Sequence, residues 1–409
     1  MGILEKIKEI EFEMSRTQKN KATEFHFGVM KARLAKLRQE LLDPSSSGGS
    51  SKPGEGFDVA RSGDARVALI GFPSVGKSSL LNYLTGTKSE AAAYEFTTLT
   101  CIPGNIYYKG VKIQMLDLPG IIEGAAYGRG RGRQVIAVAK SADLIMMILD
   151  AGREDEKNHR ELLEKELETV GLRLNKHPPD VTFVKKIGGG VKINATVKLT
   201  KLGDDPADTI YKILHEYRIH NCEMVVREDI SVDEVIDVIL GNRKYVKCLY
   251  VYNKIDTVDI EDVDYLAHLP NSTVCSVSME LNMEVVRELI WQYMGLIRIY
   301  TKRKGESPSF EEPVVLSEYR NGVSVEGAAK QISQELYDKF NYAYVWGRST
   351  KYSPQRCGLK HMLEDEDVIE IIKKTTNQEK RDKFYAKHCQ DIWDKYHAKK
   401  KGMKTPQVL

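Results

Sequence analysis

The segment that most constrains the fold of this chain is a short glycine-rich loop between an apolar run and an amphipathic one. It consists of Gly71, Phe72, Pro73, Ser74, Val75, Gly76, Lys77 and Ser78, followed by Ser79. This is the complete G-x-x-x-x-G-K-S pattern, in which backbone N–H groups surround phosphates at the start of a helix. Residues 66–70 are typical of a buried strand and residues 79–84 of a helix, as the pattern requires. We therefore expect a phosphate-binding loop rather than an ordinary glycine turn.

Two side chains of this loop have expected chemical roles. The Lys77 ammonium should reach the β- and γ-phosphates of a nucleotide, and the Ser78 hydroxyl should bind Mg²⁺. The two glycines, Gly71 and Gly76, let the backbone curl around the phosphates.

A second motif, Asp117-Leu118-Pro119-Gly120, follows a run over residues 111–116 that is typical of a strand. Ligands bind at the carboxyl ends of strands in open α/β sheets, so Asp117 is placed to hold Mg²⁺, through a water molecule. The N–H of Gly120 is placed to sense the γ-phosphate. The D-x-x-G pattern is weak alone and gains its weight from the other motifs.

A third motif, Asn253-Lys254-Ile255-Asp256, follows an apolar strand pattern over residues 247–252. A carboxylate accepts two hydrogen bonds from guanine N1–H and N2–H₂, a donor pair that adenine lacks, so Asp256 should select guanine. The stem of Lys254 can lie across the base. The alternatives are a simple turn after a strand, or an ATPase if Asp256 does not read the base.

Two weaker elements complete the expected site. Phe96, Thr97, Thr98 and Leu99 lie between the first two motifs, where a loop should close on Mg²⁺ and the γ-phosphate, with Thr98 the expected Mg²⁺ ligand and Thr97 the alternative. Ser276 and Val277 follow an expected last strand over 271–275 and are placed to contact the base through backbone N–H groups. The ordered motifs predict a guanine-nucleotide hydrolase or switch, in which Lys77, Thr98 and Gly120 serve catalysis.

Composition places this chemistry in an ordinary globular protein. The 409 residues carry a net charge of +3 and are 42% hydrophobic. No apolar stretch approaches the roughly 20 residues of a membrane span, and the charged N-terminus lacks a signal-peptide pattern. The six cysteines are scattered without metal-ligand spacing, and Cys248 and Cys275 lie in strand patterns as expected reduced core residues. We expect a cytoplasmic protein without membrane contact that is not an obligate homo-oligomer.

The apolar pattern divides the chain into seven segments. We expect a helical hairpin over 1–43, a flexible linker over 44–64, and an α/β GTPase core with a parallel sheet over 65–175 and 246–295. An α+β subdomain is inserted over 176–245, a small β-grasp domain follows over 296–374, and a basic tail covers 375–409. The hairpin is expected to pack on itself, although a partner- or ribosome-contacting arm is the alternative.

Several segments carry further expectations. In the insert, residues 188–190 are three glycines, expected as a hairpin turn that is either solvated or an RNA-contacting tip. In the β-grasp segment we expect strands over 297–301, 313–316 and 342–346, one helix over 325–340, and a solvated acidic turn over 364–367. The arginine-rich residues 128–134 are expected to form a partner-ordered switch segment, with an internal arginine finger as the alternative. The tail interleaves aromatic and basic residues, which suits either intramolecular docking or RNA.

Longer stretches resemble a known family. Residues 71–78, 94–99 and 117–125 resemble the Obg-related GTPases, and more closely the developmentally regulated GTP-binding proteins. Residues 1–7, 15–23, 344–347 and 351–356 resemble the second of the two eukaryotic subtypes. The resemblance implies a cytoplasmic GTPase acting around ribosomes and translation, a stabilising partner of the DRG family regulatory protein type, a TGS-like β-grasp domain, and slow GTP hydrolysis helped by K⁺.

One position departs from the pattern of small GTPases. Ile121 follows Gly120, where Ras-like proteins place a glutamine that orients the attacking water. An isoleucine cannot hold water by hydrogen bonding, so hydrolysis should be slow unless an ion or partner assists. Ser74 stands where several K⁺-activated GTPases have asparagine, which makes K⁺ activation a hypothesis. The alternative function is a ribosome- or RNA-binding scaffold, in which bound GTP sets conformation and hydrolysis is negligible without a partner.

Overall fold

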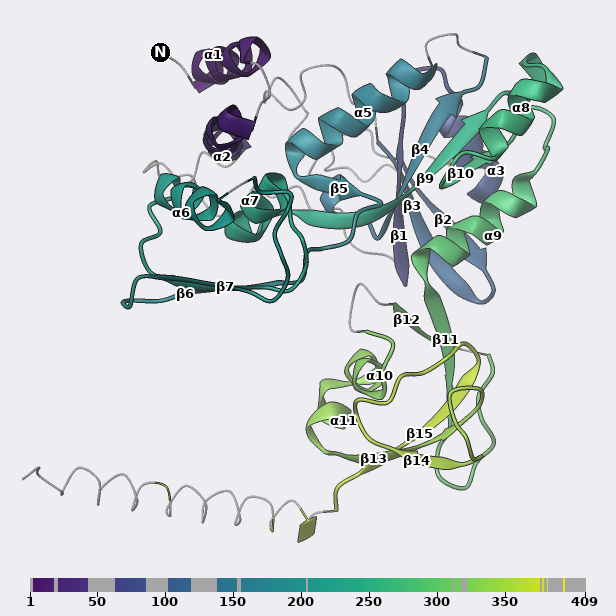
Figure 1. Cartoon of the computed structure of the whole chain (residues 1–409). Coiled ribbons are helices and arrows are strands. Elements are labelled where there is room, and N and C mark those ends of the chain that lie inside the picture. Colours follow the sequence, from purple (N-terminus) through teal and green to yellow (C-terminus); the bar gives the residue numbers. More distant parts are fainter. Residues whose placement is uncertain are drawn as a thin grey trace, which may run out of the picture. The chain divides into compact units, whose positions relative to one another are not determined.

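The computed structural model describes most of the chain in two compact units (Figure 1). The described residues are 3–17, 21–42, 63–85, 102–118, 138–152, 156–203, 205–311, 313–317 and 322–375, with 377, 378, 381 and 393. The first unit runs to Met294 apart from residues 109–111, and the second begins at Gly295 and includes those three. No helix within these ranges is long and apolar enough to cross a membrane.

A seven-stranded sheet forms the centre of the first unit. Its order is β10-β9-β4-β1-β3-β2, and β5 also pairs with β9. The pairs β1–β3, β1–β4, β4–β9, β9–β10 and β5–β9 are all parallel. The strands are β1 Ala65–Ile70, β2 Ile102–Tyr108, β3 Val111–Asp117, β4 Leu144–Asp150, β5 Leu172–Leu174, β9 Lys244–Asn253 and β10 Ser272–Val274. The expected parallel sheet is confirmed.

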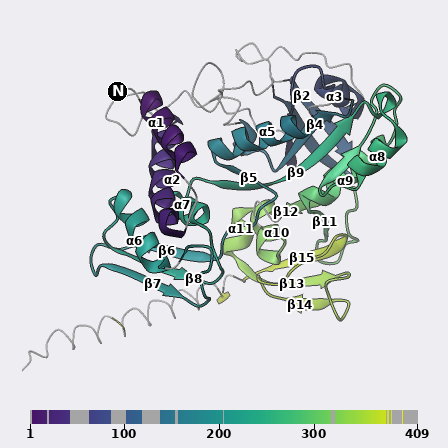
Figure 2. The ribbon, with the colours of Figure 1, turned by 45° about the horizontal axis from the view of Figure 1, so that its top comes forward.

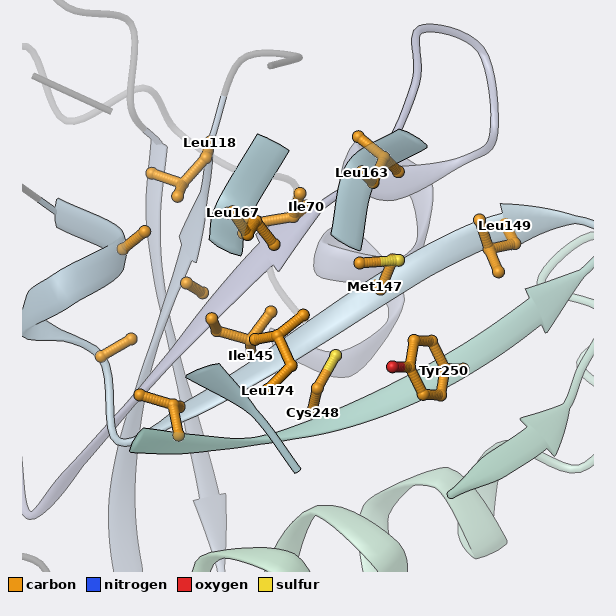
Figure 3. Close-up of a cluster of buried hydrophobic side chains, with 14 of the residues drawn as sticks. Ile70, Leu118, Ile145, Met147, Leu149, Leu163, Leu167, Leu174, Cys248 and Tyr250 are labelled. Carbon is orange, nitrogen blue, oxygen red and sulfur yellow. The ribbon is translucent and has the colours of Figure 1, made fainter. Parts of the chain in front are cut away.

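Helices lie between these strands in sequence, or after the last of them, and bury apolar residues on the sheet. They are α3 Lys77–Thr85, α5 Glu156–Val170, α8 Ile260–Ala267 and α9 Met283–Met294, with a short 3₁₀ turn η3 Ile255–Thr257. Leu163 and Leu167 of α5 pack with Ile70 and Met147 of the sheet, in a core that also contains the free thiol of Cys248 (Figure 3). The four described cysteines are free and buried, as expected of reduced core residues.

The insert between β5 and β9 is a three-stranded sheet covered by two helices. Its elements are β6 Val181–Lys185, β7 Val191–Ala195, α6 Pro206–Glu216, β8 Cys222–Val226 and α7 Val232–Leu240. Helix α7 begins with a capping box between Ser231 and Glu234 and ends at Gly241, which adopts φ 63°. These local signals explain the ends of α7.

The expected hairpin across residues 188–190 is wrong. Strand β8 lies between β6 and β7, antiparallel to the first and parallel to the second. Asn221, just before β8, accepts hydrogen bonds from the backbone N–H groups of Lys186 and Gly190 and so fixes both ends of the connection between β6 and β7 to the start of β8. Cys222, Met224 and Val226 are fully buried, which favours the central place for β8.

The N-terminal helices α1 Ile3–Arg16 and α2 Lys21–Leu42 form the expected antiparallel pair. Glu11 pairs with Arg38, and Glu13 with His26, at 2.8 and 3.2 Å. The expectation that this hairpin packs only on itself is incomplete, because α2 also lies against α6 and α7 (Figure 2).

The contact between α2 and the insert is both apolar and polar. Ala32 and Ala35 belong to the hydrophobic core of the insert, and the Tyr217 hydroxyl donates to the Ala32 carbonyl at 3.0 Å. Lys31 of α2 also pairs with Asp233 of α7 at 2.6 Å. The helical hairpin and the insert are therefore joined through a shared core.

The second unit has a five-stranded sheet in the order β12-β11-β15-β13-β14. Its elements are β11 Leu296–Thr301, β12 Val314–Ser317, α10 Val325–Ile332, α11 Gln334–Asp338, β13 Phe340–Trp346, β14 Gln355–Cys357 and β15 Asp367–Lys373. The single helix expected over 325–340 is wrong, because Ser333 is extended (φ −167°) and its hydroxyl accepts from the Glu335 N–H at the start of α11. Phe340 begins a strand instead.

The acidic segment 364–367 contains the expected turn, with Glu364 and Glu366 exposed, but its two aspartates are drawn into the structure. Asp367 is fully buried, and one of its oxygens accepts the Glu364 N–H at 2.9 Å. Asp365 accepts two hydrogen bonds from the Arg298 guanidinium in a bidentate pair, at 3.2 and 2.8 Å. Asp365 therefore ties β11 to the turn before β15, and Asp367 holds that turn from the first position of β15.

A buried ion cluster joins the insert to the central sheet. Asp237 of α7, whose side chain is 2% exposed, accepts from Arg173 of β5 at 2.6 and 2.8 Å and from Arg243 at 3.2 Å. Burial lowers the pKa of Arg243, and the neighbouring Asp237 opposes this shift. Arg243 precedes β9, so this cluster holds the insert against the start of that strand.

This cluster predicts a strong effect of one carboxylate on stability. Replacing Asp237 by alanine leaves two guanidinium groups buried without their anion, and we expect the free energy of unfolding to fall by about 3–5 kcal/mol. Asp233→Ala on the same helix is the matched control, because Asp233 is half-exposed and pairs with Lys31 at the surface, and about 1 kcal/mol or less is expected. Urea unfolding followed by circular dichroism measures both, and equal losses would contradict the role of the cluster.

Candidate nucleotide-binding site

The motifs predicted to bind nucleotide follow the carboxyl ends of strands at one edge of the sheet, which we call the nucleotide edge. Strands β1, β3, β4 and β9 are parallel, so their carboxyl ends lie on the same side, where ligands bind in open α/β sheets. Asp117 ends β3 opposite Leu69 of β1, and Asp150 ends β4 opposite Asn253 of β9. Motifs far apart in the sequence therefore meet at this edge.

The glycine-rich loop has the backbone of an anion-binding turn. Ser74 and Gly76 adopt positive φ angles of 67° and 94°, and α3 begins at Lys77. A side chain at Gly71 would place its Cβ 2.4 Å from the Ile148 carbonyl oxygen, so only glycine fits there. Val75 is buried, while Pro73, Ser74, Ser78 and Ser79 are exposed.

Lys77 is held inside the loop. Its ammonium donates to the carbonyls of Gly71 and Phe72 at 2.9 and 2.7 Å, and its side chain is largely buried. Burial lowers its pKa, and the nearby Asp117 carboxylate partly offsets this shift. An incoming phosphate would stabilise this desolvated cation, since burying a charge is costly unless it is paired.

The Phe72 ring packs against His159 of α5 at an interplanar angle of 42°. Its centroid lies 4.6 Å from that of the His159 ring, and Phe72 packs against the main hydrophobic core. This contact anchors the loop to the helix that follows β4.

Ser78 and Asp117 converge as a magnesium site requires. The Ser78 hydroxyl donates to Asp117 Oδ2 at 2.7 Å, whereas Asp117 Oδ1 is buried and has no hydrogen-bond partner among the described residues. A buried carboxylate oxygen without a partner favours a cation beside it. Within the described ranges no group of three or more His, Cys, Asp or Glu residues is placed to hold a metal ion. These two oxygen donors fit Mg²⁺, which favours oxygen and keeps several ligands from water and phosphate.

Asn253 connects the base-reading motif to the phosphate loop. Its Nδ2 donates to the Val75 carbonyl at 2.9 Å, and its Oδ1 accepts the Val277 N–H at 3.2 Å. A Cβ at Gly76 would lie 2.3 Å from Asn253 Nδ2, so the contact depends on a glycine at this position. Asn253 therefore fixes the loops at residues 75 and 277 relative to each other.

The Asp256 carboxylate is exposed and held by hydroxyl groups. Its Oδ1 accepts from Ser276 at 2.6 Å and from Ser278 at 3.3 Å. The Ser276 hydrogen bond is the main cause of the lowered pKa of Asp256, which keeps the group ionised as a guanine reader must be. Ser276 and Val277 thus lie at the same end as Asp256 and Asn253.

Asp150 is a site residue that was not predicted from the sequence. The Lys254 ammonium pairs with Asp150 Oδ2 at 2.8 Å, and Lys254 adopts φ 65°. This contact sets the direction of the lysine side chain beside Asp256. Asp150 directly follows the apolar run 144–149, just as Asp117 follows 111–116, and that pattern was the signal available.

Other expected site residues fall outside the described ranges. Phe96, Thr97, Thr98, Leu99 and Gly120 are among them, and so are Ile121 and the arginine-rich residues 128–134. The loop that should close on the γ-phosphate therefore stays a prediction.

The fold and this edge define the class of the protein. A parallel sheet, a phosphate loop with a buried lysine, a Ser–Asp pair and an Asn-Lys-x-Asp motif together describe a P-loop GTPase. The family model described as "50S ribosome-binding GTPase" matches residues 66–185, the model for the C-terminal region of that domain matches 188–296, and the TGS domain model matches 297–373.

Curated relatives then give the family. Developmentally-regulated GTP-binding protein 2 of Mus musculus is 60% identical over 374 residues, which is 91% of this chain and 100% of that protein. Developmentally-regulated G-protein 2 of Arabidopsis thaliana is 58% identical over 379 residues, 93% of each chain. The chain belongs to the family of developmentally regulated GTP-binding proteins. It binds guanine nucleotides and hydrolyses GTP.

Solved structures are similar at a lower level. The YchF GTPase of Schizosaccharomyces pombe aligns over 76% of this chain and 99% of that one, at 13% identity and a TM-score of 0.42. Era in complex with MgGDPNP and nucleotides of 16S ribosomal RNA aligns over 76% and 80%, at 18% identity and a TM-score of 0.31. The family assignment therefore depends on the relatives of higher identity.

The close approach of Gly76 to Asn253 predicts the effect of adding one methyl group. We expect Gly76→Ala to weaken GTP binding by roughly tenfold or more, because holding a non-glycine residue at positive φ costs about 1–3 kcal/mol and the Asn253 contact must also move. Titration with a fluorescent GTP analogue measures the affinity.

The control for this variant is Gly188→Ala, in the insert. An added Cβ there meets nothing within 4 Å, so GTP affinity should not change. Unchanged affinity in Gly76→Ala would show that the Asn253 contact does not matter for the nucleotide.

Proposed function

We propose that this GTPase is a ribosome-associated switch of translation in the cytoplasm, whose GTP- and GDP-bound states differ in their affinity for the ribosome. Guanine-nucleotide binding is supported by one observation: Lys77, Asp117, Asn253 and Asp256 converge at one edge of the sheet. The ribosomal part is supported by the match of residues 66–185 to a family described as ribosome-binding.

Each residue of the site has a role in this proposal. Residues 71–79 surround the phosphates, and Lys77 lies against the β- and γ-phosphate oxygens to stabilise charge in the transition state. Ser78, Asp117 and Thr98 would hold Mg²⁺, which when bound neutralises phosphate charge. The Gly120 N–H contacts the γ-phosphate, and residues 96–99 close over it.

The guanine end uses a second group of residues. Asp256 accepts the two guanine donors, and the Lys254 stem, directed by Asp150, covers the base. Ser276 keeps the carboxylate ionised, and Asn253 and Val277 hold this loop against the phosphate loop. Adenine would leave the carboxylate without its donors, so ATP should compete poorly.

Hydrolysis is proposed to depend on a monovalent cation. Ile121 offers no hydrogen bond to the attacking water, and Ser74 is exposed on the phosphate loop in a left-handed conformation that non-glycine residues rarely adopt. Such a residue at a functional loop supports a role for the Ser74 hydroxyl and backbone in holding K⁺ near the phosphates.

The cation proposal predicts a difference between two salts. Single-turnover GTP hydrolysis should be faster in K⁺ than in Na⁺ at equal ionic strength, because we expect an ion of the size of K⁺ to fit beside Ser74 and to add positive charge next to the phosphates. Ser74→Ala should reduce the difference, and Lys77→Ala is the blank. Equal turnover of the parent chain in both salts would reject K⁺ activation.

The surfaces for partners lie outside the nucleotide edge. Lys185, Lys192 and Lys198 of the insert are exposed, and they support contact with ribosomal RNA. We expect a partner of the DRG family regulatory protein type to stabilise the chain, and no obligate homo-oligomer. The seven segments with boundaries at 43, 64, 175, 245, 295 and 374 remain the proposed domain division.

The switch predicts nucleotide-dependent association with ribosomes. The full chain should sediment with purified ribosomes more strongly with a non-hydrolysable GTP analogue than with GDP, because only the γ-phosphate can order the loop at residues 96–99. Asp256→Ala, which should lose guanine binding, should show no such difference. Equal sedimentation in both nucleotide states would favour a scaffold over a switch.

A further inference from the structure

Helix α10 covers one face of the sheet in the second unit and leaves the opposite face uncovered. Ile299, Ala343, Val345 and Ile369 point to the inner face, where they pack with Val325 and Ala328 of α10. Side chains alternate across a strand, so residues 342, 344 and 346 of β13 must point to the opposite, outer face.

The outer face of β13 is a row of aromatic rings. Tyr342, Tyr344 and Trp346 are each partly exposed, and their ring centroids follow one another at 5.3 and 6.3 Å. Val368 of β15 separates Trp346 from Tyr300 of β11 in the strand register. We call these four rings the aromatic face.

The aromatic face extends beyond its strands. Phe310, whose side chain is 63% exposed, contacts the ring of Tyr300 at 5.0 Å between centroids. The exposed ring of Phe310 adds flat apolar surface to the aromatic face, and most of that ring is left uncovered by the described residues.

Cations lie directly over this row. The Arg356 guanidinium is 4.0 Å from the centroid of Tyr342, and the Lys302 ammonium is 4.6 Å from that of Trp346. Neither forms an ion pair with another described residue. Both are therefore available to an anion while remaining next to a ring.

The other charged groups of this face are already neutralised or buried. Arg298 is held by Asp365 and Glu366, and Glu370, opposite Tyr344, is only 8% exposed. The accessible charge on the aromatic face is thus positive. A ligand that complements it has flat rings at regular intervals and a negative charge on each unit.

We propose that the aromatic face binds single-stranded RNA, with unpaired bases stacked on Tyr344, Trp346 and their neighbours and with phosphates held by Arg356 and Lys302. Aromatic side chains on an open sheet with interleaved cations are the means by which proteins bind unpaired bases without strong sequence preference. A double helix does not offer its base faces, so this surface selects single strands. The proposal deepens the proposed function and rests on it for its ribosomal setting.

The experiment measures binding of a fluorescein-labelled oligouridine by the full chain, using fluorescence anisotropy, with an RNA duplex of equal length as comparison. The parent should bind the single strand more tightly. Tyr344→Leu and Trp346→Leu should each weaken binding by about tenfold while leaving the dependence on salt unchanged, because they remove stacking and keep the charges. Arg356→Ala should weaken binding. It should also reduce the slope of log affinity against log salt concentration, by the amount expected for the loss of about one phosphate contact.

Matched controls separate stacking from folding. Tyr344→Phe keeps the ring and should retain binding, and Tyr211→Leu removes a half-exposed tyrosine of α6 and should change nothing. GTP turnover and the urea unfolding curve should be normal in every variant, since turnover reports on the first unit and the unfolding curve on both.

Two results would overturn the proposal. They are equal affinity for the duplex and normal RNA affinity in both leucine variants; if those variants also lost ribosome association, the face would bind a protein partner instead. If the parent binds RNA as expected but does not sediment with ribosomes, the proposed function fails while the RNA site stands.

Discussion

Strand β9 is the element on which the arrangement of the first unit depends. Its first residues follow Arg243, which with Arg173 and Asp237 locks the insert onto the sheet, and its last residue is Asn253, which ties the base-reading loop to the phosphate loop. Between these ends β9 pairs with β4, β5 and β10, and most of its side chains are buried. A single extended segment thus holds the insert at one end and the nucleotide loops at the other.

The nucleotide edge has polar groups whose partners are incomplete without a ligand. Lys77 is buried against carbonyl groups, and one oxygen of Asp117 is buried without a partner in the described part of the chain. Desolvated groups of opposite sign, held in place by backbone, are what a phosphate and its cation require. The hydrogen bonds of Asn253 add rigidity, because they join the two loops before any nucleotide arrives.

Prediction from the sequence was correct where the signal was local. The phosphate loop, the strands that end at Asp117 and Asn253, and the two N-terminal helices follow from spacing and from residues next to each other in the chain. It was wrong where pairing was non-local: β8 entered between β6 and β7, and α2 packed on the insert. The signal for the break at Ser333 was local but weak, because serine occurs inside helices as well as at the N-cap that begins one.

By itself the sequence determined the kind of chemistry, because glycine, lysine, serine and aspartate at fixed spacing specify a phosphate loop in any setting that folds. It also indicated a parallel sheet through apolar strands alternating with helices. Only the tertiary structure decided which groups meet: Asp150 with Lys254, Asp237 with two arginines, and the rings of β13 with Arg356. Such contacts join residues distant in the chain, and they depend on strand order and register, which burial of the whole core selects.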